Sequence, residues 1–216
     1  THGINLRPSM MNDMITELNK NGMDVYRVAL TGHRGDIEEM QYLSRGFWLL
    51  DMLQAYCWSR FHASLNNVPL HYIGFSLGGM VMHDLINLGL EKQEFHIDKQ
   101  VLLAPAIALS PAADIGIDIL TLFAFERLVP SVVALEHHIA APGTSIAAYH
   151  AMKYGIEELQ KHGLEKSNFP TLVLVDPSDP SVSHKGLSRL KEKWDLNQWR
   201  IEQIDKGDFK GSKGSS

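Results

Sequence analysis

The alternation of short apolar segments with helix-patterned segments restricts this chain more than any other feature of its sequence. Runs rich in β-branched and aromatic residues predict buried strands at residues 24–30, 71–75, 100–103, 171–175 and 198–204. Apolar residues at helical spacing between them predict helices at residues 10–18, 47–65 and 78–90. Short strands separated by helices form parallel βαβ units, with helices on both faces of the sheet. We therefore predict an α/β fold.

Length and composition narrow the class further. The chain has 216 residues, which suits one domain, and 44% hydrophobic with 21% charged residues excludes a disordered chain and a membrane bundle. Lys+Arg 20 against Asp+Glu 25 gives a net charge of −5, so no nucleic-acid partner is expected. Charged residues interrupt the longest apolar stretch, residues 112–135, so we expect no integral membrane segment.

The only cysteine, Cys57, permits no internal disulfide and favours a reducing compartment, which is a weak indication of a cytoplasmic protein. Its position in an apolar helical segment predicts a small, buried residue.

The chain begins at Thr1 with no leader-like segment, and we expect that part of the domain precedes it. Nothing in the sequence indicates the oligomeric state.

Residues 107–155 break the alternation of strands and helices. The stretch is apolar, has helical periodicity and contains Pro111, Pro130 and Pro142. An insertion of this length is typical of an accessory helical element or a lid. We therefore divide the chain into a core, residues 1–106 plus 156–216, and a helical cap, residues 107–155.

The residues that best predict chemistry are Gly74-Phe75-Ser76-Leu77-Gly78-Gly79, directly after one predicted strand and at the start of a helix. A serine hydroxyl becomes a useful nucleophile when a sharp strand-to-helix turn holds it exposed, and such a turn needs small residues on both sides. The same turn directs the amide of Leu77 and the helix N-terminus at a developing oxyanion. A chance G-x-S-x-G is the alternative, but the strand before and the helix after favour a catalytic serine.

With this motif the chain resembles the serine esterases and lipases of the α/β-hydrolase superfamily, in a layout similar to monoacylglycerol lipases and lysophospholipases. The resemblance implies the α/β-hydrolase fold, a mostly parallel sheet flanked by helices with a helical cap insertion. It also places the cap over the nucleophile, so residues 117–128 are expected to line an acyl pocket or to move as a lid. The methionines Met10, Met11 and Met14 of the first helix could form a soft acyl-binding wall, although their helical periodicity favours ordinary core packing.

The resemblance also implies an oxyanion hole and a catalytic acid. Thr1-His2-Gly3-Ile4 is similar to the family's His-Gly loop, which implies the backbone amide of Ile4 as the second oxyanion donor, with Asn5 as the neighbouring candidate. Residues 170–183 are similar to the segment that carries the triad carboxylate, and the match falls on Asp179. Asp176 falls where the family often has glycine, and turn formation is the alternative role of either aspartate.

The general base is not evident. The family order is Ser, Asp, His, but no histidine follows His184, which lies only five positions after Asp179 and is expected to have a surface or capping role. We expect the base to lie beyond Ser216, in a loop that this chain does not include. His33 is expected to be structural, His83 to be a packed and hydrogen-bonded core residue, and His137-His138 lack the partners of a zinc site.

These observations predict a serine hydrolase that cleaves carboxylic esters, with lipophilic acyl esters as the favoured substrates, through a Ser-His-Asp triad and an acyl-enzyme. A small-molecule ester is the expected substrate, and neither a metal nor an organic cofactor is needed. Thioesterase, peptidase and acyltransferase activities use the same residues. The alternative is a catalytically silent α/β-hydrolase-fold protein that binds a small hydrophobic ligand.

Overall fold

The computed structural model describes residues 1–89, 95–123, 127–130 and 139–204. A four-stranded, wholly parallel sheet in the order β1-β2-β5-β6 forms its centre. These strands are β1 (His71–Phe75), β2 (Lys99–Leu103), β5 (Thr171–Val175) and β6 (Trp199–Gln203). A two-stranded antiparallel sheet lies apart from it and consists of β3 (Leu128–Pro130) and β4 (Gly143–Ser145).

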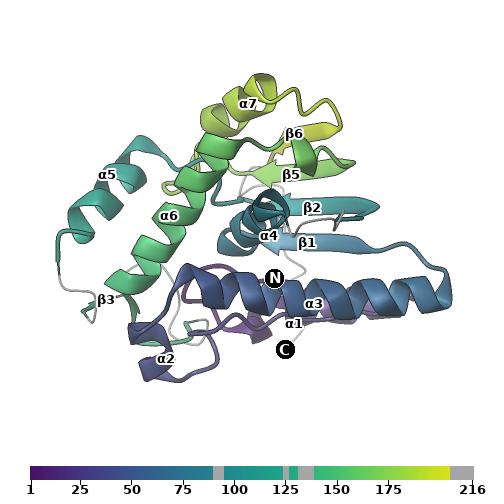
Figure 1. The fold of residues 1–216 in the computed structure, drawn as a ribbon, viewed down its shortest axis with the longest axis horizontal. Coiled ribbons are helices and arrows are strands. Elements are labelled where there is room, and N and C mark those ends of the chain that lie inside the picture. Colours follow the sequence, from purple (N-terminus) through teal and green to yellow (C-terminus); the bar gives the residue numbers. More distant parts are fainter. Residues whose placement is uncertain (90–94, 124–126, 131–138, 205–216) are drawn as a thin grey trace, which may run out of the picture.

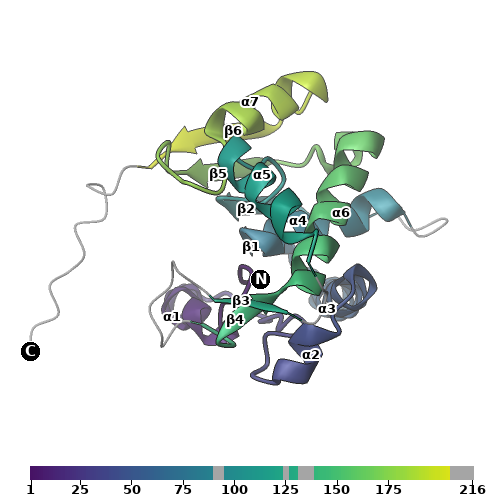
Figure 2. The same cartoon turned by 90° about the vertical axis from the view of Figure 1, so that its left-hand side faces the viewer.

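The helices lie on both sides of the main sheet (Figures 1 and 2). Helix α4 packs on β1, α3 and α6 pack on α4, and α1 lies on the opposite side of the sheet. They are α1 (Asn12–Lys20), α2 (Ile37–Gln41), α3 (Arg45–Asn66), α4 (Leu77–Leu88), α5 (Pro111–Leu120), α6 (Ile146–His162) and α7 (His184–Lys193). Short 3-10 turns occur at Pro8–Met11 and Glu165–Ser167. The predicted α/β-hydrolase architecture, a mostly parallel sheet flanked by helices, is confirmed.

Serine caps fix where three of these helices begin. The hydroxyls of Ser110, Ser145 and Ser183 accept hydrogen bonds from backbone amides in the first turns of α5, α6 and α7. Such a cap satisfies one of the donors that a helix start leaves free, typically stabilising it by about 1 kcal/mol. Helix α4 packs on β1 and α6 packs on α4, and together with the strands they form one continuous core, in which Met80, Leu102 and Val173 are fully buried.

The predicted strand at residues 24–30 is wrong. These residues form no strand, although Val28 and Leu30 are buried. A strand needs a neighbouring backbone for its ladder, and the Leu30 amide instead donates to the imidazole Nε2 of His2, at 3.1 Å. The segment therefore has the pattern of a strand without a backbone partner in the described part of the chain.

The expected cap corresponds to α5, β3, β4 and the first part of α6. Helix α5 lies beyond the carboxyl end of the main sheet, in front of the strands in Figure 2. The expected boundary at Gly155 falls within α6, which continues to His162. Residues 124–126 of the predicted lid segment lie outside the described residues.

Candidate active site

Ser76 lies in the turn between β1 and α4, at the carboxyl edge of the sheet. Its φ of +49° and ψ of −112° are unusual for a residue with a side chain and indicate backbone strain. Two hydrogen bonds hold it there, from the Ser76 amide to the Leu103 carbonyl at 2.9 Å and from the Ala106 amide to the Ser76 carbonyl at 3.0 Å. The segment after β2 thus holds the serine backbone in this conformation.

The glycines on either side of Ser76 are needed for close approach. A Cβ on Gly74 would lie 2.9 Å from Cα of Gly79, and one on Gly78 would lie 2.8 Å from the carbonyl oxygen of Thr1. Both distances are shorter than non-bonded carbon atoms allow. Small residues are therefore required here by the packing of the strand, the helix and the N-terminal segment.

The N-terminal segment lies directly against the serine turn. The Phe75 amide donates to the Thr1 carbonyl at 2.9 Å, and the Gly78 amide donates to the His2 carbonyl at 3.1 Å. Ile4 follows immediately, and its amide donates to no other group in the described part of the chain, as is also true of the Leu77 amide at the start of α4. Leu77 follows Ser76 directly, and Ile4 follows the two residues that are hydrogen-bonded to the turn. Two amides without a partner in the described residues therefore lie close to the Ser76 turn.

The neighbouring amide of Asn5 is already occupied. It donates to Nε2 of His33 at 2.8 Å, and the Asn5 side chain pairs with the backbone of Ala141 through bonds of 2.9 and 3.0 Å. Asn5 has a φ of +48°, so these bonds hold a strained backbone. Of the two oxyanion candidates, Ile4 is the one whose amide is available.

His2 and His33 form a buried pair that supports this N-terminal turn. Their ring centroids are 4.7 Å apart, and each Nε2 accepts a backbone amide, that of Leu30 for His2 and that of Asn5 for His33. Burial lowers the pKa of His2 to about 3 and that of His33 to about 4. Both imidazoles are therefore neutral at pH 7, which is the form that can accept these bonds. His33 is structural in this arrangement.

Asp179 and Asp176 lie in the turn that follows β5. One carboxylate oxygen of Asp179 accepts the amides of Ser181 and Val182, at 2.8 and 2.9 Å. One oxygen of Asp176 accepts the amide and the hydroxyl of Ser178, at 2.7 and 2.6 Å. Each aspartate thus shapes its own turn, so this bonding alone does not separate a catalytic carboxylate from a turn former.

The segment after β2 joins the turn of Asp179 to the turn of Ser76. The Ala106 amide bonds to Ser76, the Ala108 carbonyl accepts the Ser183 amide at 2.8 Å, and the Ser110 amide donates to the Ser181 carbonyl at 2.8 Å. Because β2 lies between β1 and β5, both turns occur at the same edge of the sheet, about 10 Å apart at ordinary strand spacing. No sequence signal marked residues 104–110 as the connection, because it depends on strand order.

The structure places His184 at the first position of α7, where its Nε2 accepts a hydrogen bond from the Gln203 side chain at 3.3 Å. Strand β6 ends at Gln203, and the predicted loop beyond it lies outside the described residues. His137-His138 also lie outside them. Within the described ranges no cluster of histidine, cysteine and acidic residues could hold a metal ion.

Two expectations about single residues need correction. His83 is fully buried against Trp199, but neither of its ring nitrogens has a hydrogen-bond partner in the described part of the chain. Cys57 is exposed, because it lies on the outer side of α3 and not on the side that faces α4. Helical periodicity alone does not tell which side of a helix with apolar residues on both sides will face the core.

We expect His83 to make the protein sensitive to acid. Burial lowers its pKa to about 3, so between pH 6.5 and that value the unfolded chain binds a proton that the folded chain does not. The free energy of unfolding should therefore fall as the pH falls. For this residue alone the loss between pH 7 and pH 5 is about 2 kcal/mol.

Urea denaturation of the wild type and of H83L at both pH values would measure this difference. The leucine variant should lose about 2 kcal/mol less on acidification. H62Q, which changes an exposed histidine, serves as the control and should behave as the wild type. Equal pH dependence in H83L and the wild type would show that His83 is already charged or solvated in the folded state.

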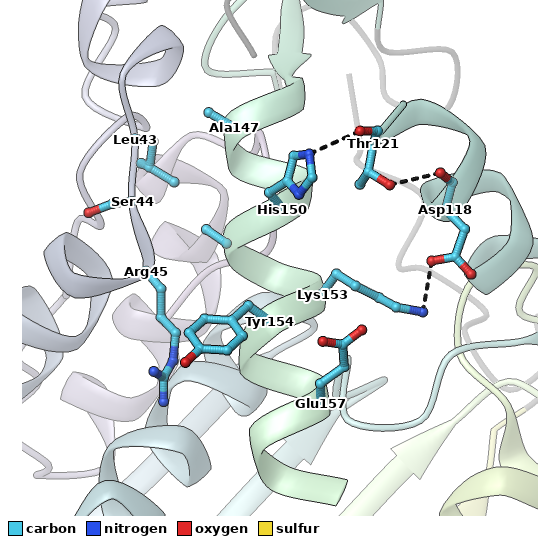
Figure 3. A pocket seen from close by; sticks show the side chains of 11 residues that line it. Leu43, Ser44, Arg45, Asp118, Thr121, Ala147, His150, Lys153, Tyr154 and Glu157 are labelled. Carbon is cyan, nitrogen blue, oxygen red and sulfur yellow. Dashed lines mark hydrogen bonds and ion pairs between the residues drawn. The ribbon is translucent and has the colours of Figure 1, made fainter. Parts of the chain in front are cut away.

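A hollow of about 510 Å³ lies away from Ser76, between the start of α3, the end of α5 and α6. In Figure 3 Lys153 is directed at Asp118, at 3.0 Å, and His150 is bonded to the carbonyl of Thr121, at 3.2 Å. Neither Ser76 nor Asp179 lines it, so it is not the pocket that the serine would serve.

The all-parallel sheet and the strained serine turn at its carboxyl edge define an α/β-hydrolase-fold protein. Solved structures agree with this class. A monoglyceride lipase of Saccharomyces cerevisiae, crystallised with a substrate analogue, is similar with a TM-score of 0.77 at 14% identity, covering 94% of this chain and 75% of that one. A structure from work on the metagenome-derived lipolytic enzymes LipS and LipT gives 0.74 at 18% identity, with 94% and 81% covered.

The monoacylglycerol lipase of Paleococcus ferrophilus is also similar, with a TM-score of 0.63 at 19% identity, covering 94% of this chain and 82% of that one. No curated relative of similar sequence was found. The family model described as Serine aminopeptidase, S33, matches residues 1–142, about two thirds of the chain. The chain belongs to this family of hydrolases, which confirms the resemblance predicted from the sequence.

In the described residues no helix is both long and apolar enough to cross a membrane.

Proposed function

We propose that the protein is a serine hydrolase of carboxylic esters, with Ser76 as its nucleophile and lipophilic acyl esters as its substrates. The observation that carries the proposal is the backbone of Ser76, strained at φ +49° in the turn between β1 and α4. Strain of this kind is kept only where the surrounding structure imposes it, and it is concentrated at functional sites. The lipid substrate class rests on the names of the structural neighbours, which are lipases and monoacylglycerol lipases.

In this proposal the Ser76 hydroxyl attacks the ester carbonyl and a base takes its proton. The amides of Ile4 and Leu77 stabilise the negative charge on the tetrahedral oxygen, helped by the positive end of the α4 dipole. The alcohol leaves with the proton that the base returns, and water then releases the acid from the acyl-enzyme. No step needs a metal or an organic cofactor.

Asp179 is proposed as the acid that orients the base and stabilises its charged form. Its turn is tied to the turn of Ser76 through residues 104–110, and only one of its carboxylate oxygens is occupied by the amides of Ser181 and Val182. The base itself is proposed to be a histidine beyond Ser216, in a connection that returns to the same edge of the sheet. His184 is not proposed for this role, because its Nε2 is bonded to Gln203 on β6.

A fluorophosphonate probe tests the proposal directly. In a protein whose chain extends beyond Ser216 and includes the proposed base, the probe should label Ser76 within minutes and inhibit hydrolysis of p-nitrophenyl acyl esters. S76A should abolish labelling, whereas S178A, which removes another serine hydroxyl of the same sheet edge, should label normally. Labelling that persists in S76A would exclude Ser76 as the nucleophile.

Comparison of p-nitrophenyl esters with aminoacyl p-nitroanilides would separate ester hydrolysis from the aminopeptidase activity in the family's description. A higher kcat/KM for the esters, rising with acyl length, is expected if lipophilic esters are the substrates. A preference for the anilides would overturn the substrate class while leaving Ser76 as the nucleophile.

The second candidate is a catalytically silent protein that binds a small hydrophobic ligand. One observation favours it, namely that no histidine of the described residues is hydrogen-bonded to Ser76 or Asp179. The test uses a protein whose chain extends beyond Ser216. Saturable binding of a fatty acid, without any labelling at Ser76, would support this candidate.

A further inference from the structure

Helix α3 has an apolar surface that nothing in the described structure covers. One side of α3 packs on α4 and α6, and Figures 1 and 2 show the helix along the outer edge of the molecule. The opposite side exposes five large side chains. They are Phe47 (49% exposed), Leu50 (52%), Trp58 (55%), Phe61 (59%) and Leu65 (70%), and together with Gln54 and Cys57 we call them the α3 stripe.

The spacing of the stripe is that of a helix-packing seam. Residues 47, 50, 54, 57 and 61 are separated alternately by three and four positions, which is the heptad pattern of helices that pack side by side. The inner side of α3 has its own apolar set, with Trp48, Met52 and Tyr56 buried. A helix that is apolar on both sides is normally buried on both sides, so the stripe indicates a partner.

The charges on α3 favour a protein partner over a membrane. Its charged residues are Arg45, Asp51 and Arg60. Arg45 is bonded to Asp84 and Asp51 to Arg34, and Arg60 is half-buried. The stripe itself carries no charge, whereas helices that lie on anionic membranes are rich in lysine and arginine on their polar side.

The stripe carries no charged side chain, so a second copy of it can pack against it. Phe47 and Leu50 lie at one end and Phe61 and Leu65 at the other, with Gln54, Cys57 and the large Trp58 around the centre. An antiparallel pair of such helices, related by a two-fold axis near residue 55, sets Leu50 opposite Phe61 and Gln54 opposite Cys57. Because a two-fold interface brings a patch against its own copy, an uncharged patch avoids repulsion there.

We propose that the α3 stripe is the interface of a homodimer in which two α3 helices pack antiparallel. Five large side chains, each about half exposed or more, give on the order of 500 Å² per copy and about 1,000 Å² in total. This area is at the lower end for specific interfaces, so a reversible dimer in the micromolar range is expected. The proposal does not depend on the hydrolase activity.

Analytical ultracentrifugation from low to high micromolar concentration would measure this dimer. Cys57 provides a second measurement, because it is the only cysteine of the chain and lies at the centre of the stripe. A short bismaleimide should therefore join two copies through Cys57 and produce a covalent dimer. F61E, which sets a charge against its own copy, should weaken association at least about tenfold and remove the cross-link.

L122E is the matched control. Leu122 is also an exposed apolar residue, 83% accessible, but it follows α5 and lies outside the stripe. It should dimerise and cross-link as the wild type does. If circular dichroism shows that F61E is unfolded, L65K at the exposed end of α3 replaces it in the same experiment.

Several results would overturn the proposal. One is a protein that stays monomeric at all concentrations without a Cys57 cross-link. A second is a dimer that L122E dissociates and F61E does not. A third is a monomer that binds phosphatidylcholine vesicles through Phe61, because the stripe would then be a membrane contact.

Discussion

D179N should lower kcat for ester hydrolysis by about 10³- to 10⁴-fold, the loss expected when a triad carboxylate becomes an amide. Asparagine keeps the side-chain oxygen that accepts the Ser181 and Val182 amides, so the turn after β5 should persist. What is lost is the negative charge that would hold the base in its productive form. Steady-state kinetics with p-nitrophenyl butyrate would measure the effect, in a protein whose chain extends beyond Ser216.

D176N is the matched control for this change. It alters an aspartate of the same turn, and asparagine can still accept the amide of Ser178. Its kcat should stay within a few-fold of the wild type. The opposite ranking, with D176N nearly inactive and D179N active, would transfer the acid role from Asp179 to Asp176.

R45M should lower the free energy of unfolding by about 3–5 kcal/mol, because it leaves the carboxylate of Asp84 buried without its partner. Arg45 donates two hydrogen bonds of 2.7 Å to Asp84, which is only 1% exposed. Burial raises the pKa of Asp84, and the neighbouring guanidinium opposes that rise. Without the guanidinium the carboxyl should take up a proton more readily, so the deficit should shrink at acidic pH. Urea denaturation at neutral and acidic pH would measure both effects.

The double variant R45M/D84L provides the control for R45M. It replaces the buried ion pair with apolar groups, and it should recover much of the lost stability, because no buried charge remains. R34M, which removes the half-exposed partner of Asp51, should cost at most about 1 kcal/mol. A small effect of R45M would mean that water reaches Asp84 in the folded protein.

Local sequence was sufficient for the elements that form the main sheet. The segments at 71–75 and 171–175 are strands with the predicted bounds. The strand predicted at 100–103 begins one residue earlier, and the strand predicted at 198–204 is one residue shorter at each end. The runs at 100–103 and 171–175 are rich in apolar residues, as a strand buried in a parallel sheet requires, whereas the run at 198–204 alternates apolar and polar residues. Residues 24–30 have a similar pattern but form no strand, because a ladder depends on a neighbour and not on propensity.

In the candidate site, too, some features follow from local sequence and others only from long-range contacts. The position of Ser76 between a strand and a helix could be predicted, because the glycines and the apolar runs around it are local signals. The hydrogen bonds of the serine turn with Ala106 and with the N-terminal segment could not, because they join residues up to 76 positions apart in the chain. The role of an amide donor is also invisible in a sequence, since every residue except proline has an amide.

The sequence by itself determined the α/β class and the serine between β1 and α4, because patterns of two and of 3.6 residues and the need for glycine beside a tight turn are local properties. Only the tertiary structure decided which side of α3 is exposed and which N-terminal amide is free. His33 reaches Asn5 across 28 positions and occupies its amide, which leaves that of Ile4. Such choices depend on which distant groups the packed chain brings together, and no local pattern contains that information.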